Sequence, residues 1–227
     1  MSLLTPVEPP VSLTDQAVAD LRREILTTRL APGESLSEAG AAQRLGLGKA
    51  PIRAALARLA EEGLVCAVPR RGWVVSLVTI RDIHEVFDLR VLLEGEAARR
   101  AAGRVDTGAL RRLDAVCGCG YRPEDEESAL AFLDANKAFH VAIAELAGNG
   151  RLARQIGRLL DESTRMLVLG LRGRDRTLEM QHEHHRLVEA LALGRGALAQ
   201  SIMQEQVAAS RAMVLAALTA PDAAMAV

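Results

Sequence analysis

Apolar residues in the first third of the chain recur at helical spacing in three short segments. The first predicted helix begins around residues 12–14 and buries Val18, Leu21 and Ile25. The second runs from about Ser37 to Leu45, and the third begins at Gly48 or Lys49 and ends near Gly63. The buried stripe of the third helix consists of Ile52, Ala55, Leu56 and Leu59.

Local signals mark the ends of these helices, and the pattern then changes to that of strands. Ser37 is able to cap the second helix, and Gly46 is placed to end it. Pro51 falls in the first turn of the third helix, where its missing N–H is tolerated. After Gly63, two β-type runs at 64–65 and 73–75 flank the turn signal at 69–72. Helix, turn, helix and β-hairpin together predict a winged helix-turn-helix, which is a DNA-binding fold.

Beyond residue 78 the pattern is helical as far as the end of the chain. A linking helix is predicted over 82–102, with the buried stripe Ile83, Val86, Leu89, Leu93 and Ala97. Further helices are predicted at about 107–116, 126–147, 151–171, 177–193 and 197–219. Six helices without strands favour an antiparallel bundle. The predicted fold class is mainly α, with a mobile tail over 1–11, a winged helix-turn-helix domain over 12–78 and an all-helical domain over 79–220.

The composition agrees with a globular protein and removes some classes of function. Hydrophobic residues make up 49% of the chain and charged residues 25%, whereas aromatic residues make up only 2%, so the core must be built from aliphatic side chains. No apolar run approaches the roughly 18 residues that a membrane span needs, and no signal sequence is visible, so we expect a cytoplasmic protein without a membrane partner. Three cysteines, an odd number, argue against a disulfide framework.

Bulk charge does not indicate nucleic-acid binding. The whole chain has a formal net charge of −1, and residues 1–78 carry nine Lys/Arg against eight Asp/Glu. A basic DNA-binding face would therefore have to come from local clustering of Lys49, Arg53, Arg70 and Arg71.

Particular residues carry a resemblance to a known family. The segments 30–34, 36–38, 45–47, 51–53 and 62–65 resemble the DNA-binding domain of the GntR family of bacterial transcription regulators. The order of winged helix and helical bundle is similar to the FadR-like subclass, whose effector domain is called FCD. The matching residues there are Leu89-Arg90 with Leu93-Glu94, Phe139-His140 with Gly148-Asn149, and Glu183-His184 with Glu189-Ala190. The resemblance covers about residues 12–215.

Carried over residue by residue, the resemblance implies DNA contacts at Gly48, Lys49, Ala50, Arg53, Arg71 and Gly72. Three of these positions depart from the family pattern: the family usually has Ser or Thr in place of Gly48, Arg in place of Lys49 and Thr in place of Ala50. The family also commonly has Arg in the preceding helix at the position of Ala39. Lysine cannot form the bidentate fork that arginine offers to guanine, and alanine donates nothing, so we expect an atypical operator. The alternative interpretation is that Lys49 and Arg53 form a solvated helix face.

The resemblance also implies a polar site in the bundle. Many members of the subclass hold a divalent metal with one aspartate and three histidines. In this chain Asn136 stands at the aspartate position, His140 and His184 match two of the histidines, and Gln206 replaces the third histidine. Carboxamides are poor metal ligands, so no cofactor is expected to be required, although a degraded Zn, Ni or Mn-type site on His140, His184 and Asn136 stays open. Satisfied buried histidines are another alternative.

We favour a metal-free pocket in which Asn136, His140, His184 and Gln206 bind an organic ligand directly. Arg90 and Arg165 are the candidates to pair with a ligand carboxylate, the alternative for each being a surface or dimer salt bridge.

Taken together, the sequence predicts a homodimeric, ligand-responsive transcription regulator, most simply a repressor, that binds operator DNA and a small organic acid. Two other hypotheses remain: a ligand-binding or interaction protein with weakened sequence-specific DNA binding, and a metal-dependent enzyme. The sequence shows no nucleophile elbow, phosphate loop or pair of acid/base carboxylates, so we expect that the protein is not an enzyme.

Overall fold

A computed structural model describes residues 12–122, 125–173 and 175–219 of the chain. Contacts divide it into two compact units, Met1–Ser76 and Leu77–Val227, and each unit is described by itself. The sequence had placed this boundary after residue 78. The predicted mobile tail over 1–11 and residue 220 of the predicted helical domain lie outside the described residues.

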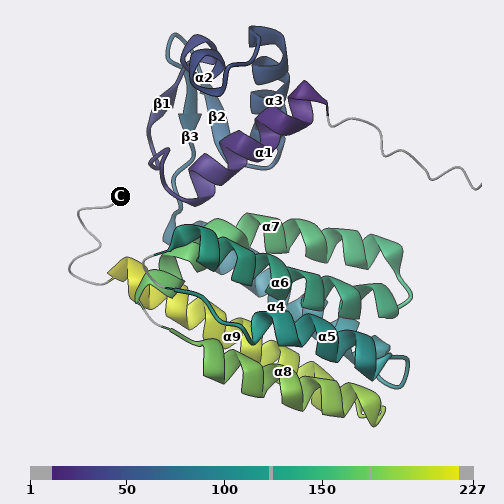
Figure 1. Cartoon of the computed structure of the whole chain (residues 1–227). Helices are drawn as coiled ribbons and strands as arrows, with labels where there is room; N and C mark the ends of the chain where they lie inside the picture. Colours follow the sequence, from purple (N-terminus) through teal and green to yellow (C-terminus); the bar gives the residue numbers. More distant parts are fainter. Residues whose placement is uncertain (1–11, 123–124, 174, 220–227) are drawn as a thin grey trace, which may run out of the picture. The chain divides into compact units, whose positions relative to one another are not determined.

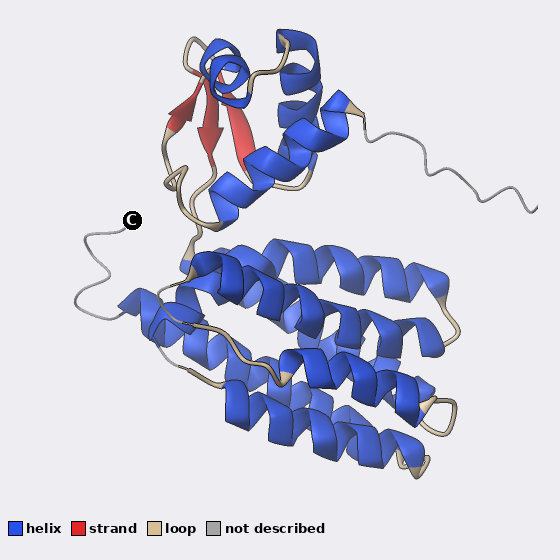
Figure 2. Ribbon diagram, viewed as in Figure 1, coloured by secondary structure: helices blue, strands red, loops and turns tan. Residues whose placement is uncertain are grey.

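Three helices and a small sheet form the N-terminal unit (Figures 1 and 2). The helices are α1 (Leu13–Leu26), α2 (Glu38–Leu45) and α3 (Lys49–Glu61). The side chains of Ser12 and Ser37 cap α1 and α2 by accepting hydrogen bonds from the backbone N–H groups of Asp15 and Gly40. Gly46 ends α2 with φ of 66°, a left-handed conformation that glycine adopts without steric cost. The predicted helices of the motif are confirmed.

The sheet contains the predicted hairpin and one strand that the sequence pattern did not reveal. Strands β2 (Val65–Val68) and β3 (Gly72–Val75) pair antiparallel, with Cys66 opposite Val74 and Val68 opposite Gly72. The short β1 (Ser35–Leu36) pairs with the other edge of β3, so the strand order is β1-β3-β2. Two residues are too few to display alternation, which is why β1 could not be predicted.

The core of this unit lies where the helices meet the sheet. Ile52, Ala55, Leu56 and Leu59, the predicted stripe of α3, are fully buried, and they pack in one cluster with Val18, Leu21 and Ile25 of α1. Burial of this stripe leaves the opposite face of α3 to the solvent.

Six helices and no strand make up the described part of the C-terminal unit (Figure 2). Their bounds are α4 (Ile80–Ala101), α5 (Thr107–Cys117), α6 (Glu126–Leu146), α7 (Gly150–Gly173), α8 (Thr177–Ala192) and α9 (Gly196–Thr219). Helix α4 packs against α9, α7 and α6 and is therefore the central element of the bundle. Among the residues described, no helix combines the length and the apolarity that crossing a membrane requires.

The buried face of α4 differs from the predicted stripe. Leu89 was expected in the core, but it is 45% exposed, and its neighbour Leu92 is 62% exposed. Phe87, Arg90 and Glu94 face the interior instead. The prediction for Leu89 was wrong because the stripe was read from apolar residues alone, whereas Arg90 and Glu94 are charged residues that neutralise each other inside the bundle.

Candidate functional site

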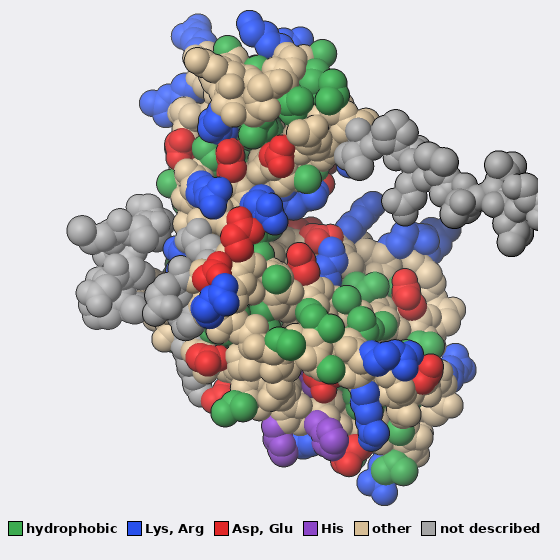
Figure 3. Space-filling model, viewed as in Figure 1, with side chains coloured by type: hydrophobic (Ala, Val, Ile, Leu, Met, Phe, Trp, Pro, Cys, Tyr) green, Lys and Arg blue, Asp and Glu red, His purple; other side chains and the backbone are tan. Residues whose placement is uncertain are grey.

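The predicted DNA-contacting residues all lie on the surface of the N-terminal unit. Gly48 is the N-cap of α3, and Lys49, Ala50 and Arg53 follow on the exposed face of its first turns. Arg71 and Gly72 are exposed at the turn between β2 and β3, beside the equally exposed Arg70. Figure 3 shows Lys and Arg side chains in blue around the rim of this unit. Exposed donors at the start of a second motif helix and at a wing tip suit contact with DNA phosphates and base edges.

Arg53 is held in place by a carboxylate of the preceding helix. Its Nε and Nη2 atoms donate to Glu38 of α2 at 2.8–3.0 Å. The hydrogen bond from Arg53 lowers the pKa of Glu38, and Trp73 of β3 contributes a further hydrogen bond to the same carboxylate. Glu38 therefore connects α2, α3 and the wing, and it orients the guanidinium before any DNA is bound.

Other arginines of this unit stabilise the packing of its helices instead. Arg58 of α3 pairs with Asp15 of α1 at 2.6 Å, and Arg22 of α1 donates to Glu62 at 2.6–3.2 Å. Both arginines join α1 to the region of α3, and Arg58 does so from an exposed position of its helix.

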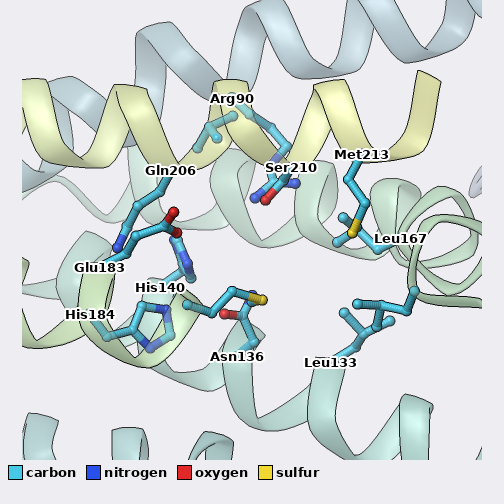
Figure 4. A pocket seen from close by; sticks show the side chains of 13 residues that line it. Arg90, Leu133, Asn136, His140, Leu167, Glu183, His184, Gln206, Ser210 and Met213 are labelled. Carbon is cyan, nitrogen blue, oxygen red and sulfur yellow. The ribbon is translucent and has the colours of Figure 1, made fainter. Parts of the chain in front are cut away.

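Four predicted effector residues from three helices line one pocket of the C-terminal unit, together with Arg90 of α4 (Figure 4). Asn136 and His140 come from α6, His184 from α8 and Gln206 from α9. All four are at least 94% buried, and the ring centroids of His140 and His184 are 5.7 Å apart. The structure therefore brings together residues that are up to 70 positions apart in the chain.

Each histidine of the pocket is oriented by a carboxylate behind it. Nδ1 of His140 lies 2.6 Å from Oε2 of Glu94, and Nδ1 of His184 lies 2.8 Å from Oδ1 of Asp114. Burial lowers the pKa of His184, although the hydrogen bond to Asp114 opposes that shift. A neutral imidazole that donates from Nδ1 carries a lone pair on Nε2, so His184 offers the pocket a hydrogen-bond acceptor.

Arg90 lines the pocket, but its charge is already balanced. Its Nε donates to Glu94 Oε1 at 2.7 Å and its Nη1 donates to Ser163 at 3.1 Å. Burial alone would raise the pKa of Glu94, but the charge of Arg90 and then that of His140 outweigh burial and bring it to about 2. Glu94 is thus an anion at neutral pH, and it is shared by one arginine and one histidine.

Arg165, the other candidate for a ligand carboxylate, does not line this pocket. It is buried on α7, and its Nη2 donates to the backbone oxygen of Leu77 at 3.4 Å. The structure therefore separates Arg165 from Asn136, His140, His184 and Gln206.

Three polar atoms of the two amide side chains in the pocket are buried without a hydrogen-bond partner in the described part of the chain. Oδ1 of Asn136 and both Oε1 and Nε2 of Gln206 have no hydrogen-bond partner among the described residues. Such groups cost free energy in the unliganded protein, on the order of 1–3 kcal/mol each, and so mark a place where a ligand or water is expected. The free volume is about 20 Å³, which is room for only one or two water molecules.

The donor set does not fit a tightly held divalent metal. Among the described residues, no three His, Cys, Asp or Glu side chains are grouped so that they could hold an ion. The carboxylates behind His140 and His184 resemble the outer partners of metal-bound histidines, but the positions facing the pocket are two neutral amides. Two imidazoles and two carboxamides supply no negative charge to a divalent cation.

Sequence reasoning missed several residues that build this pocket. Glu94 could have been found from its i, i+4 spacing to Arg90, which predicts an ion pair on one helix face. Asp114, Glu183 and Met213 carry no such local signal, because their roles depend on which helices pack together. His182 and His185, the neighbours of His184, are exposed on the outer face of α8.

Comparisons with known proteins identify the families to which the two units belong. Residues 13–75 match the family described as bacterial regulatory proteins, gntR family, and residues 85–209 match the FCD domain. An uncharacterised HTH-type transcriptional regulator of Streptomyces ambofaciens is 29% identical over 185 residues, covering 81% of this chain and 77% of that protein. The HTH-type transcriptional repressor GlaR of Escherichia coli is 27% identical, covering 82% and 88% of the two chains. The solved structure of E. coli McbR/YncC has the same fold, with a TM-score of 0.68 and 24% identity over 88% of this chain and 97% of that one.

Proposed function

Because the chain belongs to the GntR family of bacterial regulatory proteins and carries an FCD domain, we propose that it is a repressor whose operator binding is controlled by a small molecule. One of its relatives, GlaR, is named as a repressor, and this supports repression of transcription as the mode of control. Such a protein acts on chromosomal DNA, so its proposed location is the cytoplasm.

One observation carries the effector half of the proposal: polar side chains converge on one buried pocket, and three of their amide atoms have no hydrogen-bond partner among the residues that the structure describes. Asn136 and Gln206 come from α6 and α9, and they face the two histidines held by Glu94 and Asp114. A core that only had to be stable would place apolar side chains there. A ligand that forms hydrogen bonds with these buried polar groups would offset the cost of burying them, so the arrangement supports ligand binding.

The prediction of an organic acid as effector receives little support from the charges around the pocket. Arg90 is neutralised by Glu94, Arg165 lies elsewhere, and the other charged side chain in the lining is the anionic Glu183, which pairs with Arg176 at 2.7 Å. We therefore propose a small organic effector that needs no cationic anchor and no resident metal.

We also propose a homodimer, in which two recognition helices meet a two-fold-related operator. The exposed leucines of α4, Leu89 and Leu92, support an interface on that helix. Light scattering on the purified protein tests this point: a dimer mass is expected, and it should fall towards the monomer in the Leu92→Glu variant.

The decisive experiment is a mobility-shift titration on the DNA upstream of the protein's own gene, with and without fractionated metabolite extract. We expect a retarded complex that weakens as salt is raised, because phosphate contacts release counterions, and that dissociates with one metabolite fraction. Gln206→Leu should bind the same DNA but lose the response to that fraction.

The same titration separates the alternatives. A salt dependence near zero, or equal affinity for unrelated DNA, would favour a ligand-binding or interaction protein. A metal-dependent enzyme is the least supported alternative, because two imidazoles and two carboxamides bring no negative charge to a catalytic ion and Glu183 is already paired with Arg176.

A further inference from the structure

The polar centre of the bundle pocket is too small for an organic effector, but a larger cleft lies beside it. The pocket that His140, His184 and Gln206 help to line has a free volume of about 20 Å³. A second cavity between the ends of α7 and α9 measures about 610 Å³, which is within the usual range of roughly 300–1,000 Å³ for small-molecule sites. The polar side chains that could recognise an effector therefore line one cavity, and the volume that could hold its body belongs to the neighbouring cavity.

Two features form the partition between the compartments. Met213 of α9 lines both of them. The ion pair of Arg176 with Glu183 bridges them as well, because Arg176 lines the larger cleft, Glu183 lines the polar centre, and their atoms lie 2.7 Å apart. The two cavities are thus neighbours with a shared wall.

Met213 is the movable part of that wall. A Cβ placed at position 170 would lie 2.7 Å from Cε of Met213, so this side chain rests against α7 only because residue 170 is a glycine. Methionine is unbranched and has three rotatable side-chain bonds, and it adapts to new surroundings at low cost. A rotation of Met213 would join the polar centre to the larger cleft.

The larger cleft has the chemistry of a site for an apolar body. Four alanines of α9 and two glycines of α7 line most of it. Its polar features are Glu179 and Arg176, which pair at 2.7 Å. Arg176 is only 4% exposed, and its Nη1 atom has no hydrogen-bond partner among the described residues. A buried guanidinium with an unused donor indicates that something other than the chain completes this surface.

We propose that the effector is an amphipathic molecule whose apolar body occupies the Ala/Gly-lined cleft and whose uncharged polar head passes Met213 to reach Asn136, His140, His184 and Gln206. The inference rests on the proposed function, since it identifies the class of ligand for the same regulatory domain. The head must donate as well as accept hydrogen bonds, because His184 and the Oδ1 atom of Asn136 offer acceptors and Gln206 offers both. A primary amide or a hydroxyl meets that requirement, and a carboxylate does not.

The test uses the intact protein and two series of straight-chain probes, the primary amides from acetamide to decanamide and the carboxylates from acetate to decanoate, each below its aggregation concentration. Affinity is measured by calorimetry and by the shift in Tm. In the amide series we expect affinity to rise by about fourfold for each added methylene until the cleft is full, which is the increment for burying one methylene. Each carboxylate should bind at least about tenfold more weakly than the amide of equal length.

Three variants make the test specific. Ala212→Phe fills the cleft from an exposed position of α9, so the dependence of affinity on probe chain length should disappear. Ala216→Phe is the substitute variant if Ala212→Phe does not fold. Ala197→Phe places the same ring on an exposed position at the other end of α9 and should behave like the unaltered protein. Gln206→Leu should remove the preference for amides over carboxylates and keep the dependence on chain length.

A flat response to chain length, or the same rise in Ala212→Phe as in Ala197→Phe, overturns the inference. Tighter binding of carboxylates than of amides overturns the assignment of the head group. Neither result would affect the repressor function, because the mobility-shift titration with metabolite fractions tests that function separately.

Discussion

Glu94 of α4 holds His140 of α6 in place: Oε2 of the carboxylate lies 2.6 Å from Nδ1 of the imidazole, and both side chains are at least 94% buried. The other oxygen of Glu94 accepts a hydrogen bond from Arg90 at 2.7 Å. One carboxylate therefore fixes a ring of the pocket and also neutralises the buried guanidinium beside it. Four residues separate the end of strand β3 from the start of helix α4, so the side chains that orient His140 belong to the first helix after the wing.

Replacing Glu94 by Gln should destabilise the protein strongly. The change leaves the charge of Arg90 buried without its counter-ion, a situation that costs about 3–5 kcal/mol in the free energy of unfolding. Urea unfolding at pH 7 measures this loss. Glu96→Gln is the matched control, because Glu96 pairs with Arg99 and Arg100 on the surface and should matter little. Equal losses in the two variants would contradict the assignment.

Acidification should weaken the fold through two buried groups, His184 and Glu94. Burial lowers the pKa of His184 below its ordinary value of 6.5, so the unfolded chain takes up a proton there first and stability falls as the pH drops below about 6.5. The pKa of Glu94 is about 2 against an ordinary 4.5, so its contribution is present above pH 4.5 and is lost between 4.5 and 2. Urea midpoints between pH 7.5 and 5.5 should decline in the unaltered protein and change less in His184→Gln. An identical slope in both proteins would remove His184 as the cause.

Arg53 and Arg58 provide a matched pair on the recognition helix. Arg53→Ala should weaken operator binding and reduce the slope of log affinity against log salt by about 1, because one phosphate or base contact is lost. Arg58→Ala should leave DNA affinity unchanged, since Arg58 pairs with Asp15 of α1. Fluorescence anisotropy at three or more salt concentrations measures both. If Arg58→Ala has the larger effect, the DNA-binding face has been placed on the wrong side of α3.

Two substitutions should convert the pocket into a metal site. Asn136→Asp combined with Gln206→His adds one negative charge and one imidazole beside His140 and His184, whose Nδ1 atoms already bind carboxylates. We expect the double variant to bind Zn²⁺, Ni²⁺ or Mn²⁺ at least about 100-fold more tightly than the unaltered chain. Isothermal titration and elemental analysis check this, and a stoichiometric metal in the unaltered protein would show that carboxamides suffice here.

Local patterns were enough to predict most of the architecture. Helical spacing with caps such as Ser37 and stops such as Gly46 located the helices to within a few residues, and the switch to β-type runs after Gly63 located the wing. These features depend on residues that are near one another in the chain, so the sequence displays them directly. The polar residues of the bundle, Asn136 and His140 one turn apart, were visible in the same way.

Tertiary packing decided how those residues are used. Glu94 meets His140 across 46 positions of the chain, and Asp114 meets His184 across 70, and neither pairing leaves a periodic trace. The same packing placed Arg165 away from the pocket and left Leu89 exposed on α4.

The sequence by itself determined a winged helix, a six-helix bundle and the identity of the polar groups inside it. Only the tertiary structure decided which charges are already neutralised, how little space the polar centre contains, and that Met213 separates it from the larger cleft. The physical reason is that local periodicity reports the face on which a residue lies, whereas partners and free volume depend on the helices that pack against that face.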